Sequence, residues 1–171
     1  VLEINRSLQD EQREADALNR IGTVHLFRGD SASAREFYQE AKAIADKRHD
    51  VDLQARCIAN IGSTHVYRNE FEEAREHYEQ ALELFRRLGD RNRQATILNN
   101  LARIHISTGS YREALDFYSK AIEIHTEIGD RGAAGLAHNN RAIILTVLDR
   151  QDEAEAALQE ALKIARALSY P

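Results

Sequence analysis

The sequence predicts an all-α protein, a right-handed superhelical α-solenoid of tandem helix-turn-helix repeats. A repeat of 40 residues runs through the chain of 171 residues without insertion or deletion, and a fixed period of this size is typical of repeat architectures. Within each repeat, apolar residues follow the i, i+3, i+4, i+7 spacing of an amphipathic helix. The sequence has one proline and eight glycines, which leaves little material for β-turns.

The repeat is defined by columns of residues that lie 40 positions apart. Small residues form three columns: Gly22, Gly62, Ala102 and Ala142; Ala34, Ala74, Ala114 and Ala154; Ala41, Ala81, Ala121 and Ala161. Two aromatic columns contain Tyr38, Tyr78 and Tyr118, and His25, His65 and His105. Small residues at crossing points let helices approach to about 8–10 Å, so each unit should stack on the next.

Each repeat should contain two helices joined by a short turn. We expect the first helices at 12–28, 52–68, 92–108 and 132–148, and the second helices at 31–48, 71–88, 111–128 and 151–168. Gly109 suits the left-handed position after a helix, and Ser110 suits the N-cap of the next one. The pairs at 29–30, 89–90 and 129–130, each Gly-Asp, should play the same parts.

We expect one array over residues 1–171, with repeats at about 13–52, 53–92, 93–132 and 133–171. Residues 1–10 should be the tail of a preceding repeat's second helix, because Leu8 and Asp10 align with Leu88 and Asp90 at the same period. The sequence contains no methionine. We therefore expect the chain to be a fragment of a longer protein.

Composition argues against several classes of function. The longest apolar stretch, residues 143–148, has six residues and contains Thr146, whereas a membrane span needs about 18 or more. The net charge of −5 argues against a nucleic-acid partner. Cys57 is the only cysteine, which excludes an intramolecular disulfide and a multi-cysteine zinc site. A lone cysteine fits a reducing compartment, so we expect a cytoplasmic protein.

We expect no enzymatic activity, no cofactor and no bound metal. The sequence lacks the phosphate-binding motifs G-x-x-x-x-G-K-[ST] and G-x-G-x-x-G and the zinc motif H-E-x-x-H. Ser63 and His65 are two residues apart, so they do not face each other on a helix. The three histidines of the column should lie about 8–10 Å apart, too far to share one ion with bonds of about 2 Å. We interpret them as packed aromatics with one satisfied ring nitrogen, and Cys57 as a buried hydrophobe.

These columns resemble the tetratricopeptide repeat. The Gly/Ala column at 22, 62, 102 and 142 matches the family's small first-helix position, and the alanine and tyrosine columns match its second-helix positions. The family's tryptophan is replaced by Leu18, Ile58, Leu98 and His138, its first-helix tyrosine by histidine, and its closing proline is absent. The length of 40 residues is similar to a long-helix subclass found in regulatory scaffolds. The resemblance implies a protein-interaction module, the sensory or docking part of a larger regulatory protein.

The resemblance also implies that one stripe on each first helix faces a concave ligand groove. We name these the first-helix stripes: Asp16, Arg20, Thr23 and Phe27; Arg56, Asn60, Ser63 and Tyr67; Thr96, Asn100, Arg103 and Ser107; Leu136, Asn140, Ile143 and Val147. An asparagine amide both donates and accepts hydrogen bonds, so the asparagine column can pair with an extended peptide backbone. Alternatively, these asparagines tie one repeat to the next or face water.

The sequence therefore predicts a scaffold that binds a protein or peptide, without nucleic acid or membrane. The predicted groove residues are Arg20, Arg56, Asn60, Tyr67, Asn99, Asn100, Arg103, Asn139, Asn140 and Ile143. Arginines on the stripes and glutamates on the second helices favour an acidic peptide, unless these charges are only a solvated surface. The alternative function is self-association, as a homodimer or a longer solenoid joined through exposed apolar ends.

Overall fold

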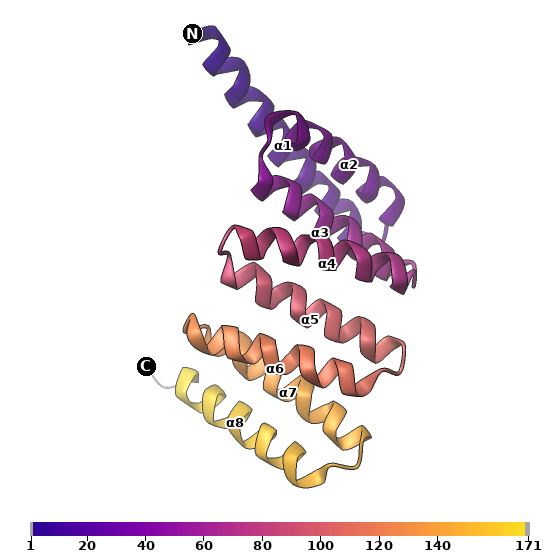
Figure 1. Cartoon of the computed structure of the whole chain (residues 1–171), viewed down its shortest axis with the longest axis vertical. Helices are drawn as coiled ribbons and strands as arrows, with labels where there is room; N and C mark the ends of the chain where they lie inside the picture. The colour runs from indigo at the N-terminus through magenta and orange to yellow at the C-terminus, as the bar shows by residue number, and fades with distance from the viewer. Residues whose placement is uncertain (1, 170–171) are drawn as a thin grey trace. The chain divides into compact units, whose positions relative to one another are not determined.

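The computed structural model describes residues 2–169, with side chains from 10 to 168, and every regular element in this part of the chain is an α-helix. The helices, drawn in Figure 1, are α1 (Leu2–Phe27), α2 (Ser31–Arg48), α3 (Val51–Tyr67), α4 (Phe71–Arg87), α5 (Arg91–Ser107), α6 (Tyr111–Glu127), α7 (Arg131–Val147) and α8 (Gln151–Ser169). The predicted all-α helical-repeat solenoid is confirmed. Each helix in the described range is too short or too polar to cross a bilayer.

The chain divides into two compact units, unit 1 at residues 1–88 and unit 2 at residues 89–171. In unit 1, α1 packs along α2 and α3 along α4, and α2 also packs on α3. Unit 2 has the same pattern, with α5 along α6, α7 along α8, and α6 on α7. Each unit therefore consists of two helical hairpins, and the second helix of one hairpin covers the first helix of the next.

The turns place one residue each in the left-handed helical region. Gly109, between α5 and α6, has a φ of +76°, as its predicted position requires, and glycine adopts this conformation without steric cost. His49, Asn69 and Asp149 adopt it too, with φ of 55°, 59° and 58°. The turn geometry is therefore kept in every repeat, even where the sequence offers no glycine.

Aspartates follow four of these turn positions and cap the next helix: Asp30, Asp50, Asp90 and Asp130. The caps at Asp30, Asp90 and Asp130 are those predicted from the sequence. Asp30, Asp90 and Asp130 each accept a hydrogen bond from the backbone N–H three residues later, at 3.1, 2.9 and 3.0 Å. Ser110 also occupies an N-cap position, but its side chain makes no capping bond. Its hydroxyl instead lies 3.5 Å from the Thr108 hydroxyl, so the neighbouring threonine takes the place of the backbone amide.

The structure differs from the prediction at the start of the chain. α1 is continuous from Leu2 to Phe27, so no turn separates the predicted tail at 1–10 from the helix that follows; Val1 lies outside the described residues. Gln9 stands where the repeat has Gly89, whose φ is +68°. Glutamine disfavours the left-handed region and favours a helix, so the helix continues through this position.

The small-residue columns lie at helix crossings. Ala34 on α2 is fully buried, and a Cβ at Gly22 on α1 would lie 2.7 Å from the Tyr38 ring. At Gly62 the corresponding Cβ would lie 3.1 Å from the Tyr78 ring. In unit 1 the tyrosine column therefore packs directly on the backbone of the first helices.

Candidate functional site

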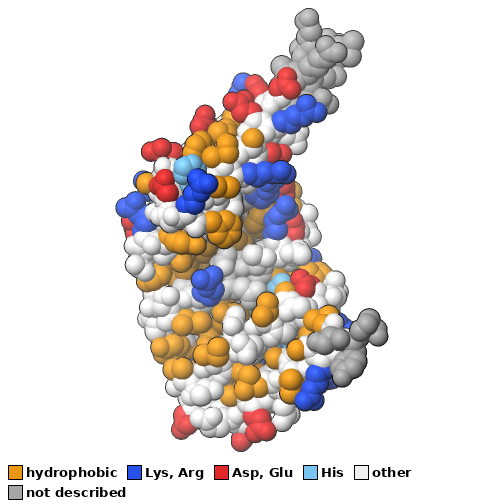
Figure 2. All heavy atoms as spheres, turned by 180° about the vertical axis from the view of Figure 1, so that it is seen from behind, with side chains coloured by type: hydrophobic (Ala, Val, Ile, Leu, Met, Phe, Trp, Pro, Cys, Tyr) orange, Lys and Arg blue, Asp and Glu red, His pale blue; other side chains and the backbone are white. Residues whose placement is uncertain are grey.

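Apolar side chains are exposed along the first-helix stripes. In unit 1, Phe27 on α1 is 82% exposed and Tyr67 on α3 is 56% exposed. In unit 2, Leu136, Ile143 and Val147 on α7 are 70%, 58% and 57% exposed; we call these three the α7 patch. In Figure 2, hydrophobic side chains reach the surface of unit 2 among mostly uncharged groups. An exposed apolar cluster on one helix face is typical of an interaction site.

Arg56 is held by two carboxylates within unit 1. Its Nη2 lies 3.1 Å from Asp16 Oδ1 on α1, and its Nη1 lies 3.5 Å from Asp52 Oδ2 on the same helix. Two negative charges therefore face this single positive charge, which leaves little attraction for an acidic ligand here. Arg20 and Arg103 are exposed, so the predicted preference for an acidic peptide depends on them.

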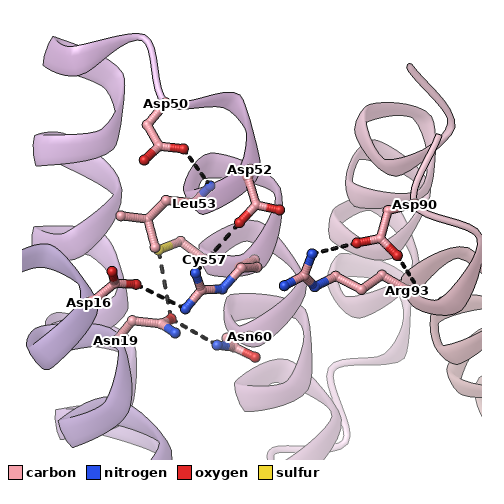
Figure 3. Close-up of polar contacts among 10 residues, drawn as sticks. Asp16, Asn19, Asp50, Asp52, Leu53, Cys57, Asn60, Asp90 and Arg93 are labelled. Atoms are coloured by element: carbon pink, nitrogen blue, oxygen red, sulfur yellow. Dashed lines mark hydrogen bonds and ion pairs between the residues drawn. The ribbon is translucent and has the colours of Figure 1, made fainter. Parts of the chain in front are cut away.

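Asn60 lies at the contact between α3 and α1. Its Nδ2 donates a hydrogen bond of 2.8 Å to Asn19 Oδ1, and the Cys57 thiol lies 3.7 Å from the same oxygen (Figure 3). Asn19 is buried, and burial also raises the pKa of the Cys57 thiol to about 12. Asn60 therefore ties one repeat to the next, while Asn100 occupies the same column on α5 and is half-buried.

The other predicted asparagines of unit 2 differ in their surroundings. Asn99 is half-buried, and its Nδ2 donates to His125 Nε2 at 3.3 Å, so it faces α6. Asn140 hydrogen-bonds the Tyr118 side chain, which partly offsets the rise in pKa that burial imposes on this tyrosine. Asn139 is exposed on α7. Only Asn140 therefore combines partial burial with a position beside the exposed side chains of the α7 patch.

Tyrosine hydroxyls from the second helices reach the first-helix stripes of unit 1. Tyr38 Oη donates to Thr23 Oγ1 at 3.2 Å, and Tyr78 Oη lies 3.0 Å from Ser63 Oγ. The sequence places Thr23 and Ser63 on the stripes, but it does not indicate these bonds. Because the hydroxyl pairs cross from second to first helix, they fix the stripe residues relative to the hairpin.

The histidine column is packed against aromatic rings. Its ring-centroid separations are 5.1 Å for His25 with Phe37, 5.0 Å for His65 with His77, and 5.1 Å for His105 with Phe117. The first two also place Nδ1 at 3.1 Å from an Asp30 oxygen and 2.7 Å from a Glu70 oxygen. These contacts agree with the interpretation of packed aromatics that have one satisfied nitrogen.

Three exposed residues were not among the predicted groove residues. Phe27, Leu136 and Val147 lie on the stripes, but of the large apolar stripe residues the predicted set included only Tyr67 and Ile143. Their apolar side chains could have predicted these three residues, because a large apolar side chain at an outward stripe position has no role in packing the array.

The comparisons with known proteins identify the family. A family model described as tetratricopeptide repeat matches residues 13–87, 54–127 and 93–167. The chain belongs to the tetratricopeptide-repeat family. Each match spans two helical hairpins of the tetratricopeptide array, and together they cover almost all of the described residues. No curated protein matches the chain significantly in sequence.

Solved structures share the tetratricopeptide fold at low sequence identity. BtubC (BKLC) from P. vanneervenii is 21% identical, with a TM-score of 0.79 over 95% of this chain and 74% of its own. Aspartyl phosphate phosphatase F from Bacillus subtilis is 13% identical, with a TM-score of 0.90 over 94% and 42%. A Rap protein complexed with competence and sporulation factor is 22% identical, with a TM-score of 0.83 over 91% and 44%. The chain thus spans less than half the length of the last two proteins.

Proposed function

We propose that this tetratricopeptide chain is a non-catalytic protein-interaction scaffold that binds a peptide or partner segment on its first-helix stripes. The α7 patch is the observation that carries the proposal. On the same helix, Ala142, Ile144 and Leu145 are buried, so α7 already has a packing face. The α7 patch adds a second apolar face, which packing within the described residues does not require.

The polar groups beside the exposed side chains suit a peptide backbone. An asparagine amide has two N–H donors and one acceptor oxygen. Asn60 uses one N–H for Asn19, and Asn140 makes one side-chain bond with Tyr118. Each amide therefore keeps further hydrogen-bonding capacity, so a tie within the array and a contact with a ligand are compatible.

The exposed charges suggest which ligand side chains fit. In unit 1, Arg20 lies on the same stripe as the exposed Phe27. In unit 2, Arg103 is exposed on α5. A segment with apolar anchors and acidic flanking residues would meet both kinds of group, and charge complementarity of this kind mainly accelerates association.

The setting of the scaffold is proposed from its fold and its cysteine. The structure of a Rap protein with competence and sporulation factor shares the fold, which supports a sensory or docking role within a larger regulatory protein. A single buried thiol at Cys57 is compatible with the reducing cytoplasm. We place the chain there on this basis.

Selection of random displayed peptides on the wild-type chain tests the proposal. Selected peptides should bind the Ile143→Glu variant at least about tenfold more weakly, because burying one aliphatic side chain contributes about 1.5–3 kcal/mol and each tenfold corresponds to 1.4 kcal/mol. Val51→Glu is the matched control, since Val51 is 38% exposed at the start of α3 but lies off the stripes. Equal affinity for both variants, or no selected peptide with a folded chain, would count against binding on the stripes.

A further inference from the structure

Unit 1 shows how the first helix of one repeat is seated on the preceding hairpin. Leu53 and Cys57 of α3 share one buried cluster with Ala15 of α1 and Ala41 and Ala45 of α2. One turn further along α3, Ile61 packs with Ala34 and Tyr38 of α2. A hydrogen bond from Asn60 to Asn19 fixes the register of α3 on α1. The hairpin α1–α2 therefore forms a seat for an incoming first helix.

The hairpin α7–α8 has an equivalent surface, which is open and forms a groove. The groove has a volume of about 490 Å³ and is lined by Gly132, Gly135, Leu136, Asn139, Leu158, Ala161, Leu162, Ile164, Ala165 and Leu168. Five of these residues have equivalents three repeats of 40 residues earlier in the sequence. Gly135, Asn139, Leu158, Ala161 and Ala165 correspond to Ala15, Asn19, Tyr38, Ala41 and Ala45 of unit 1. These are residues on which α3 rests in unit 1.

The open groove is more apolar than its counterpart in unit 1. Three leucines replace charged residues at equivalent positions, Leu136 for Asp16, Leu162 for Lys42 and Leu168 for Arg48. Leu158 replaces the buried aromatic Tyr38. All four leucines are exposed. Leu162 and Leu168 continue columns that are also apolar in the intervening repeats, with Leu82 and Ile122, and Leu88 and Ile128. The groove therefore has the apolar surface on which a first helix packs.

α1 carries the side chains that such a groove accepts. Leu53, Cys57 and Ile61 are the α3 residues in the two buried clusters of unit 1, and Thr64 on the same helix is also buried. Moving back one repeat gives Arg13, Ala17, Ile21 and Val24. Ile21 and Val24 are 42% and 49% exposed. The face of α1 therefore repeats the small and β-branched pattern of α3, but it remains accessible.

We propose that copies of this chain associate head to tail, with α1 of one copy seated in the α7–α8 groove of another. The register of α3 on α1 then places Arg20 of one copy opposite Asn139 of the other. Both side chains are exposed, and the guanidinium donates where Asn60 donates in unit 1. Arg13 takes the place of Leu53, where its aliphatic stem can cover apolar surface while the charge stays in water.

This arrangement accounts for more exposed apolar surface than a symmetric pairing of two α8 helices. A symmetric pair would cover the leucines but leave Ile21 and Val24 in water, whereas one head-to-tail contact covers both faces. A head-to-tail contact is heterologous, so it produces rings or open chains of copies rather than a closed dimer. The contact shares Leu136 and Arg20 with the first-helix stripes, so association and ligand binding compete for these two residues.

Analytical ultracentrifugation of the 171-residue chain over a range of concentrations tests the proposal. The wild type should grow in mass with concentration. Val24→Glu, which blocks α1, and Leu162→Glu, which blocks the groove, should each be monomeric. Mixed in equal amounts, the two variants should form a dimer with one copy of each, because each supplies the face that the other lacks. Val51→Glu is the matched control, since Val51 is 38% exposed at the start of α3, outside both α1 and the α7–α8 groove, and it should associate like the wild type.

Several results would overturn the proposal. They are a wild type that stays monomeric, a mixture that stays monomeric, or a Val24→Glu variant that still associates, which would indicate symmetric pairing through α8. Circular dichroism should confirm that each variant is helical. If either glutamate variant fails to fold, Ile21→Gln and Leu168→Gln test the same two faces with a smaller perturbation.

Discussion

Replacing Asn60 with alanine removes the polar tie between α3 and α1. The amide of Asn60 donates to Asn19 Oδ1 at 2.8 Å, and Asn19 is only 6% exposed. After the change, the Cys57 thiol at 3.7 Å is the remaining contact of that oxygen, and a thiol is a weak donor. A lost hydrogen bond costs about 0.5–1.5 kcal/mol, and an unsatisfied buried acceptor costs about 1–3 kcal/mol. Because Asn60 itself is half-buried, we expect a loss of about 1–2 kcal/mol in the free energy of unfolding.

Urea unfolding followed by far-ultraviolet circular dichroism measures this loss. The midpoint should fall while the slope of the transition is unchanged. Asn100→Ala is the control from the same column, and it should change the free energy of unfolding by less than about 0.5 kcal/mol. A fully stable Asn60→Ala variant would show that the amide serves a ligand alone. An equal loss in both variants would show that the contact with Asn19 is not the cause.

Three further predictions concern packing, reactivity and pH. Gly22→Ala should lower the free energy of unfolding in urea by up to about 2 kcal/mol, because the new Cβ would lie 2.7 Å from the Tyr38 ring and overpacking outweighs the gain in helix propensity. As the control, Gly132→Ala should be neutral or stabilising, since the atom nearest to its new Cβ would be 3.7 Å away. The Cys57 thiol, with a pKa raised by burial to about 12, should react with a thiol reagent only when the chain unfolds, and fast reaction in the folded state would contradict its burial. Burial lowers the pKa of His125 below 6.5, although the negative charge of Asp130 opposes this shift. The unfolded chain therefore binds a proton at this histidine more readily than the folded chain, so the stability that the neutral side chain contributes is complete above pH 6.5 and is lost as the pH falls below that value. In thermal melts, His125→Gln should reduce this loss of stability at low pH.

The helices could be predicted from the sequence because their causes are local and repeated. Glycine and aspartate at the turns, and small residues at the crossings, are visible as columns in the sequence itself. The one error in the helices, at Gln9, follows from the same physics: alignment placed this residue in a turn position, although a glutamine favours a continued helix. A column therefore predicts a position, while the residue that occupies it decides the backbone conformation.

The candidate site was harder to predict because it depends on what covers each column. Asn99 and Asn139 occupy the same column, yet Asn99 is half-buried against His125 whereas Asn139 lines an open groove. Likewise, the charge of Arg56 is visible in the sequence, but its pairing with Asp16 depends on how α3 is rotated against α1. Side chains with the same sequence position in a repeat can thus have different functions in neighbouring repeats.

The uniform turns make the chain modular at the level of its gene. α3 and α5 both begin directly after a capping aspartate, Asp50 or Asp90. Deleting residues 51–90 would join Asp50 to Arg91 and recreate the same junction, and duplicating that segment would do the same. Unequal recombination between repeats therefore changes the length of the array without introducing a new type of turn, so the number of hairpins can change in evolution or by engineering while each local structure is preserved.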